Sequence, residues 1–143
     1  MKTLKQLLAE KKRPLAVVSP KDSVFHALSV MAQHDVGALL VLDGEQLVGI
    51  FSERDYARKV TLLGKSSQDT RVAEIMSEKV AYVTPDRSLQ ECMALMTDKH
   101  FRHLPVLGDD GAVLGIISIG DLVKETISNQ EFLIGELARY ISG

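Results

Sequence analysis

Cysteine, excess positive charge and long apolar runs are all scarce in this chain of 143 residues. The single cysteine, Cys92, permits no internal disulfide, and the cytoplasm is therefore the expected compartment. The 17 Lys and Arg residues against 19 Asp and Glu residues give a net charge of -2, which offers no broad cationic surface to a nucleic-acid backbone. No run approaches the ~20 apolar residues of a membrane span, and the charged segment 1–13 lacks the apolar core of a signal peptide. We therefore expect neither a nucleic-acid partner nor a membrane partner.

What the sequence does contain is one pattern written twice. The stretch from Val18 to Asp55 is repeated, with substitutions, from Val83 to Asp121. Equivalent residues are 65 positions apart at the start of the repeat and 66 apart at its end, because the second copy has one extra loop residue. In each copy, apolar residues at the spacing i, i+3, i+4, i+7 mark one face of a helix. Two apolar runs separated by a turn follow, and they predict a hairpin. These runs are 38–42 and 47–51 in the first copy, and 104–107 and 113–117 in the second.

The duplication predicts an α/β (α+β) fold in which the two copies pack on each other about a pseudo-twofold axis. A repeated unit with one apolar face usually cannot bury that face alone, so each small sheet with its helices is expected to need the other copy. A short helix should introduce each copy, with Thr3 and Thr70 as caps. At this length the chain forms one core and leaves no room for a separate catalytic domain. The predicted units are repeat one at 1–66, repeat two at 67–127 and an amphipathic tail helix at 128–143.

The tail helix has no counterpart at the start of the chain. Its apolar residues include Phe132, Leu133, Leu137, Tyr140 and Ile141. Such a face needs a partner, which is either the body of the same chain or a second subunit. We prefer a homodimer, because these architectures have exposed helical faces to cover.

The second strand of each hairpin ends in the same motif. Gly49–Asp55 and Gly115–Asp121 both read Gly, two apolar residues, Ser, two variable residues and Asp. A hydroxyl that donates or accepts, with a carboxylate three residues later, can hold the hydroxyls of a ribose or a sugar phosphate. The alternative is that Ser and Asp only cap the helix that begins there. One copy alone would favour the cap, whereas two matched copies favour a binding site.

At this point the chain resembles the CBS-domain family in its tandem form, often called a Bateman module. The resemblance covers essentially the whole chain. It rests on the two strand-end motifs, on Ser19-Pro20 and Thr84-Pro85, and on Phe101–Val106. It implies a regulatory module, not an enzyme, that binds an adenosine-containing ligand such as AMP, ADP, ATP, adenosylmethionine or NAD(H) between the copies. AMP is the first ligand expected, and an unidentified regulated protein could receive the signal.

The resemblance also implies two sites, each built from the strand end of one copy and the middle strand and pre-helix loop of the other. Site one would join Ile50, Ser52, Arg54 and Asp55 to Thr84, Leu89, Arg102, His103 and Pro105. Site two would join Ile116, Ser118, Gly120 and Asp121 to Ser19, Val24, Gly37 and Ala38.

Charge distinguishes the two sites. Guanidinium groups form charge-assisted hydrogen bonds with phosphate, so we expect the phosphate in site one, near Arg54, Arg102 and His103. Asp55 would take the ribose hydroxyls there, while Ile50 and Leu89 would enclose the adenine.

Other chemistries fit the sequence less well. His100 and His103 could share a helix face as metal ligands, but no third ligand stands nearby. Cys92 falls on the buried face of its helix, which favours a core thiol over a nucleophile. A catalytic triad of Ser52, His103 and Asp55 fails because the Asp is expected at the ribose end of the pocket. We expect no metal and no enzyme, and the second candidate function is a ligand-independent dimerisation scaffold.

Overall fold

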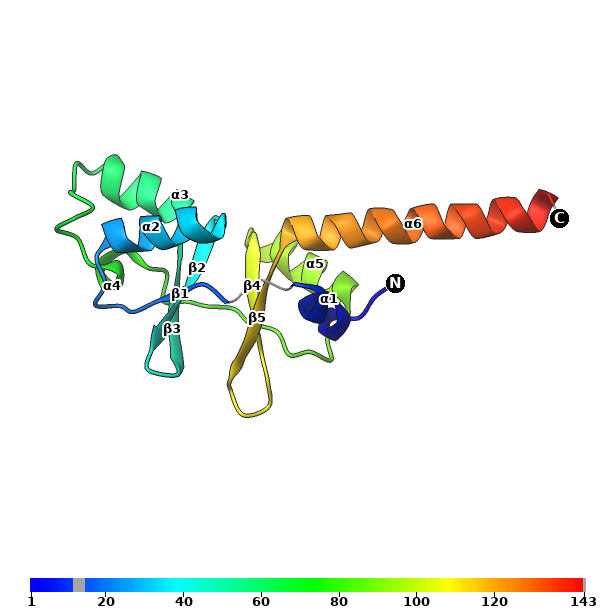
Figure 1. The fold of residues 1–143 in the computed structure, drawn as a ribbon, viewed down its shortest axis with the longest axis horizontal. Coiled ribbons are helices and arrows are strands. Elements are labelled where there is room, and N and C mark those ends of the chain that lie inside the picture. Colours follow the sequence, from blue (N-terminus) through cyan, green and yellow to red (C-terminus); the bar gives the residue numbers. More distant parts are fainter. Residues whose placement is uncertain (12–14, 143) are drawn as a thin grey trace.

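The computed structural model describes residues 1–11 and 15–142, so the end of the charged segment 1–13 lies outside the described residues. Two hairpins lie side by side with their turns on the same side of the molecule, and the helices lie towards the opposite side and at the two flanks (Figure 1). Strand β2 (Ala38–Asp43) pairs with β3 (Gln46–Ser52), and β4 (His103–Leu107) pairs with β5 (Val113–Ser118), both antiparallel. This mixture of small sheets and helices confirms the predicted fold class.

The two copies repeat each other residue by residue. In the first, β1 (Val17–Val18) runs parallel to β2, and Val18 pairs with Val41. In the second, Val83 forms a parallel bridge to Val106, each partner displaced by the same 65 residues. The duplication expected from the sequence is therefore present in the strand pairing.

The main helix of each copy also follows the predicted periodicity. Helix α2 (Val24–His34) and helix α5 (Leu89–Lys99) bury residues that are one and two turns apart, and both have Ser N-caps. Each ends at a residue in the left-handed conformation, Asp35 at φ 52° and His100 at φ 58°. His100 therefore terminates a helix and does not share a helix face with His103.

Each introductory helix packs in the core of the other copy. Helix α1 (Leu4–Glu10) precedes the first copy in sequence, yet Leu4 lies in the hydrophobic cluster of the second copy. Helix α4 (Val72–Ile75) precedes the second copy, and it contributes both its terminal residues to the cluster of the first. Each copy thus completes the core of the other, which supplies a physical reason for the chain to act as one unit.

Of the two predicted helix caps, one is confirmed and one is wrong. The Thr3 side chain accepts a hydrogen bond from the Gln6 backbone, so the cap of α1 is confirmed. The prediction for Thr70 is wrong, because Arg71 is the N-cap of α4. The Thr70 hydroxyl instead donates to the Ser66 carbonyl within the preceding loop.

The first copy ends in helix α3 (Glu53–Tyr56), which continues as a π-helical turn at Ala57–Thr61. The second ends in α6 (Ile119–Ser142), a single helix of 24 residues. The predicted tail helix is the continuation of this element and not a separate one. It projects away from the body to the C-terminus (Figure 1). Among the described residues, no helix combines the length and apolarity that crossing a membrane requires.

Candidate functional site

Both strand-end motifs form the cap that the sequence allowed as an alternative. In the first copy the Ser52 backbone donates to Asp55 Oδ2 at 3.0 Å, and the Asp55 backbone donates to Ser52 Oγ at 3.2 Å. The second copy repeats this exchange between Ser118 and Asp121, at 2.8 and 3.1 Å. The caps hold both carboxylates at the ends of β3 and β5, beside the first turn of the helix that follows each strand.

A cavity of about 730 Å³ lies at the second of these motifs and is lined by both copies. Its volume falls within the range of pockets for small-molecule ligands, ~300–1,000 Å³. Five of the eight residues predicted for site two line it: Gly37, Ala38, Ile116, Ser118 and Asp121. The first two come from the first copy and the others from the second. His103, predicted for site one, also lines this cavity.

Lys11, just beyond α1, is one of several residues lining this cavity that sequence reasoning missed, and Glu10, His34 and Asp35 are others that carry ionisable groups. The Lys11 ammonium group lies 2.6 Å from Asp121 Oδ2 and donates to the Ile116 carbonyl at 2.8 Å. Burial alone would raise the pKa of the Asp121 carboxyl, but the hydrogen bonds from Lys11 and Ser118 hold that pKa below its ordinary value. Asp121 is therefore a carboxylate at neutral pH, facing a cation across the cavity wall.

The repeat contains a signal that could have indicated such a cation. In the first copy, Lys59 pairs with Asp55 at 3.3 Å within the same helical segment. The residue 66 positions later is Glu125, so Asp121 has no lysine at the equivalent place. The second carboxylate takes its cation from α1 instead, because α1 packs against the second copy.

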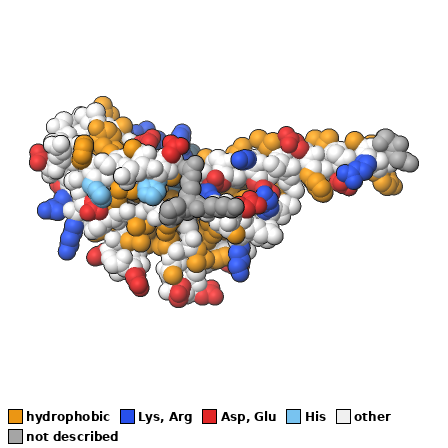
Figure 2. Space-filling view, viewed as in Figure 1, with side chains coloured by type: hydrophobic (Ala, Val, Ile, Leu, Met, Phe, Trp, Pro, Cys, Tyr) orange, Lys and Arg blue, Asp and Glu red, His pale blue; other side chains and the backbone are white. Residues whose placement is uncertain are grey.

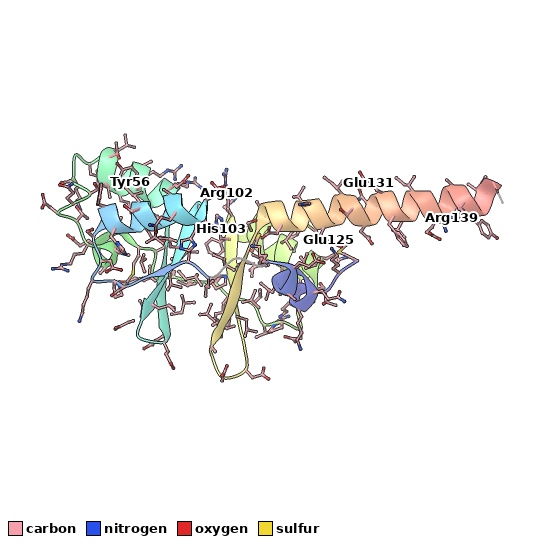
Figure 3. The ribbon with its side chains drawn as sticks, viewed as in Figure 1. Tyr56, Arg102, His103, Glu125, Glu131 and Arg139 are labelled. Atoms are coloured by element: carbon pink, nitrogen blue, oxygen red, sulfur yellow. The ribbon has the colours of Figure 1, made fainter. Side chains whose placement is uncertain are left out.

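His103 stands beside this charged pair. Burial lowers the pKa of its imidazole, and the positive charges of Lys11 and Arg102 lower it further, while Asp121 acts in the opposite direction. The ring is therefore neutral near pH 7 and can donate or accept a hydrogen bond in the cavity. Figure 3 shows Arg102 and His103 together at the start of β4, with Arg102 at the exposed surface.

The other residues predicted for site one lie around the end of β3 and the loop before α5. Ile50 exchanges two backbone hydrogen bonds with Ser77, at 3.1 and 2.9 Å, so this strand is partly covered by the chain itself. Arg54 is exposed, and the Thr84 hydroxyl donates to Asp86. Asp55 is shared between its cap and Lys59. This end is more occupied by protein groups than the corresponding end of the second copy.

Three of the predicted contact residues lie in the cores. Leu89 is 2% exposed in the second cluster, Val24 is fully buried in the first, and Pro105 is buried within β4. Their side chains therefore stabilise the repeats, and their place in a ligand site stays a prediction. Ser19 donates its backbone N–H to Asp22, and Gly120 lies exposed in the first turn of α6.

Metal and thiol chemistry find no support in the described residues. Within 1–11 and 15–142, no group of three or more His, Cys, Asp or Glu side chains is arranged to hold a metal ion. Cys92 is buried in the second cluster, and burial raises the pKa of its thiol, which disfavours the nucleophilic thiolate.

Comparisons with known proteins agree with this arrangement. The family model of the CBS domain matches twice, at residues 7–61 and 72–128. A mitochondrial CBS domain-containing protein of Arabidopsis thaliana, CBSX3, is 44% identical over 127 residues, which are 85% of this chain and 61% of that protein. The chain thus spans less than two thirds of the length of this relative.

Two solved structures are similar in fold. A protein with CBS domains from Burkholderia ambifaria MC40-6, assigned to signal transduction, is 52% identical, with a TM-score of 0.85 over 90% of this chain and 96% of its own. The cytosolic domain of the Mg²⁺ channel MgtE, solved in complex with ATP, is 30% identical, with a TM-score of 0.64 over 77% of this chain and 44% of its own.

Proposed function

The chain belongs to the CBS-domain family, and from this membership we propose that it is a sensor that binds an adenine nucleotide in the cavity between its two copies. Pairs of CBS domains are regulatory modules that generally bind adenosine-containing ligands, and no catalytic family matches the described features. AMP is the ligand we favour, with ADP, ATP or NAD(H) as the other members of the class.

The cavity at Asp121 is the observation that carries the proposal. It combines a carboxylate for hydroxyl groups, a lysine for an anion, and the small residues Gly37 and Ala38, which let a flat ring approach the backbone. These three kinds of contact suit a ribose phosphate with an attached purine, and the acidic residues Glu10 and Asp35, which also line the cavity, are further acceptors for hydroxyl or amino groups. The structure of MgtE with ATP supports the same ligand class.

In this proposal, Asp121 accepts hydrogen bonds from the ribose hydroxyls. Lys11, whose ammonium group has three donors and now bonds Asp121 and the Ile116 carbonyl, pairs with a phosphate of the ligand. Ser118 and His103 supply neutral polar contacts. Site one, with Arg54, Asp55 and Arg102, remains a second proposed site, and the phosphate preference for it remains a prediction.

Binding can act at a distance only if the ligand favours one arrangement of the copies or subunits over another. We propose that the output is a change in self-association or in binding to a regulated protein. The cytoplasmic location and the homodimer are likewise proposals, which cell fractionation and sedimentation test directly.

Calorimetric titration of AMP tests the function. The wild-type protein is expected to bind, and Asp121→Ala to lose affinity by roughly tenfold to a hundredfold, since a hydrogen bond to a charged group contributes about 1.5–3 kcal/mol. Asp43→Ala, which removes an exposed carboxylate from the β2–β3 turn, is the matched control and should bind like the wild type.

The scaffold alternative makes a different prediction. It requires that AMP, ATP and NADH give no binding heat with the wild-type protein, and that none of them raises its melting temperature. That result would remove the nucleotide proposal. Equal affinities for the wild type and Asp121→Ala would keep a ligand but remove this cavity as its site.

A further inference from the structure

The outer part of α6 is uncovered by any described part of the chain. The last buried side chain of this helix is Glu125, and every residue from 131 to 140 is exposed. Apolar side chains run along the projecting helix in Figure 2. An isolated helix shorter than ~12–15 residues is only marginally stable in water, and Gly135 weakens this one further. The projecting helix therefore needs a partner.

Five of the exposed apolar residues form one ordered row with Gln130, which we call the α6 stripe, while Phe132, Leu133 and Tyr140 are exposed outside it. Its members follow one another at alternating intervals of four and three residues, and all are exposed. They are Val123, Ile127, Gln130, Ile134, Leu137 and Ile141. This alternation is the heptad spacing of a coiled-coil seam, in which the three isoleucines occupy one core position and the remaining three residues the other.

The charges of the projecting part disfavour a membrane surface as its partner. Helices that lie on membranes carry Lys and Arg along their polar face. The segment from 128 to 142 has two acidic residues, Glu131 and Glu136, and one basic residue, Arg139, which itself pairs with Glu136 at 3.0 Å. Figure 3 shows Glu131 and Arg139 on this part of the helix.

The composition of the stripe instead fits a second copy of itself. β-Branched residues at the first core position with leucine at the second favour two parallel strands; here the first position holds isoleucine three times, and the second holds Leu137. Gln130 is the one polar member, and in a parallel pair it meets its own counterpart, whereas an antiparallel pair buries it against Ile134. We propose that the α6 stripe pairs with the same stripe of a second copy as a parallel, two-stranded coiled coil.

The parallel orientation follows from Glu131. An antiparallel pair that matches all six layers is centred near residue 132, so it places the Glu131 carboxylates of the two copies against each other. Like charges in such positions are destabilising. A parallel pair stacks Ile134 on Ile134 and places Glu131 near residue 126 of the other copy, an uncharged threonine. This pairing does not depend on nucleotide binding.

Sedimentation equilibrium of two matched variants tests the surface. Ile134 is 66% exposed within the stripe, and Phe132 is 63% exposed outside it, so replacing either by lysine leaves the body intact. Ile134→Lys should raise the dimer dissociation constant at least tenfold, whereas Phe132→Lys should sediment as the wild type. A wild-type protein that is monomeric at micromolar concentration would overturn the proposal, as would equal dissociation constants for the two variants.

Disulfide trapping tests the orientation. Cys92 is buried, so a cysteine introduced at the surface is the accessible thiol. Under mild oxidation, Ile134→Cys and Ile141→Cys should each form a covalent dimer, because each faces its own counterpart, while Phe132→Cys should not. Cross-linking that requires Val123→Cys mixed with Ile141→Cys would overturn the parallel arrangement. Co-sedimentation of the monomer with anionic vesicles would overturn self-pairing in favour of a membrane surface.

Discussion

Asp121 shows how one residue can serve the fold and a ligand site together. Its carboxylate completes the helix cap with Ser118 and forms an ion pair with the ammonium group of Lys11. Asp55 forms the same cap in the first copy, so the cap does not account for the cavity and the Lys11 contact at Asp121. What distinguishes the second motif is that its cation comes from α1, an element that is distant in sequence. Ligand binding at Asp121 would therefore act on α1 first.

Lys11→Met tests this coupling at the level of single groups. Without the ammonium, the pKa of Asp121 should rise towards or above its ordinary value, because burial then acts with less opposition. The pKa of His103 should rise as well, because one of the positive charges that lower it is gone. Titration of both side chains by NMR measures the two shifts. A His103 pKa that stays unchanged would show that Lys11 is too far away to influence the cavity.

The same substitution predicts a pH dependence of stability. The folded-state pKa of Asp121 is depressed, so its contribution is present above the unfolded value of about 3.9 and is lost as pH falls through the folded value. Lys11→Met should therefore be less stable than the wild type at pH 7, by about 0.2–1 kcal/mol for a partly exposed pair. The difference should shrink as pH falls below about 4. Urea unfolding at both pH values measures it.

At the scale of elements, the exchange of α1 and α4 between cores is the feature that ties the repeats together. Leu4 is fully buried in the second cluster, and the Lys2 backbone donates to Glu125 on α6 at 3.1 Å. Helix α1 is thus held at both ends, by Lys2 and by Lys11, against elements of the second copy.

Leu4→Ala should therefore destabilise the second repeat although it lies before the first. A buried leucine truncated to alanine costs about 2–5 kcal/mol, since it loses apolar burial and leaves a cavity. Lys5→Ala, at the exposed neighbouring position, should change the free energy of unfolding by less than about 0.5 kcal/mol. Hydrogen exchange should report faster opening at Cys92 and Ile117 in Leu4→Ala. Loss of protection confined to the first copy would contradict the exchanged packing.

Local patterns predicted the elements well, and non-local packing explains what they missed. The alternating spacing of apolar residues in a strand, and their spacing in a helix, involve only residues that are close in sequence. The strands of both hairpins and the helices α2 and α5 could therefore be placed from sequence. Which core α1 enters depends on distant surfaces, and Lys11 was missed for that reason. The sequence around Ser128 and Asn129 resembles a helix start, yet no Pro or Gly interrupts the chain there and α6 continues through it. Leu89 and Val24 were expected at the ligand, whereas their periodicity already assigned them to the buried helix face.

At the scale of the whole molecule, pseudo-symmetry produces two related ends that are chemically different. At the first, Ile50 is bonded to Ser77, and Asp55 is paired within its own helix. At the second, the corresponding carboxylate faces a cavity lined by both copies. A ligand there touches the first copy, the second copy and α1 together, so it can change how they are arranged. The projecting α6, which starts two residues before Asp121, offers a direct route from this site to a second subunit.

The central claim is that an adenine nucleotide occupies the cavity between the copies. Mapping of backbone amide chemical shifts during an AMP titration tests it most directly. The account predicts the largest shifts at Gly37 and Ala38 of the first copy together with Ser118 and Asp121 of the second, saturating at the same nucleotide concentration. No shifts, or shifts confined to the surface of a single copy, would contradict it.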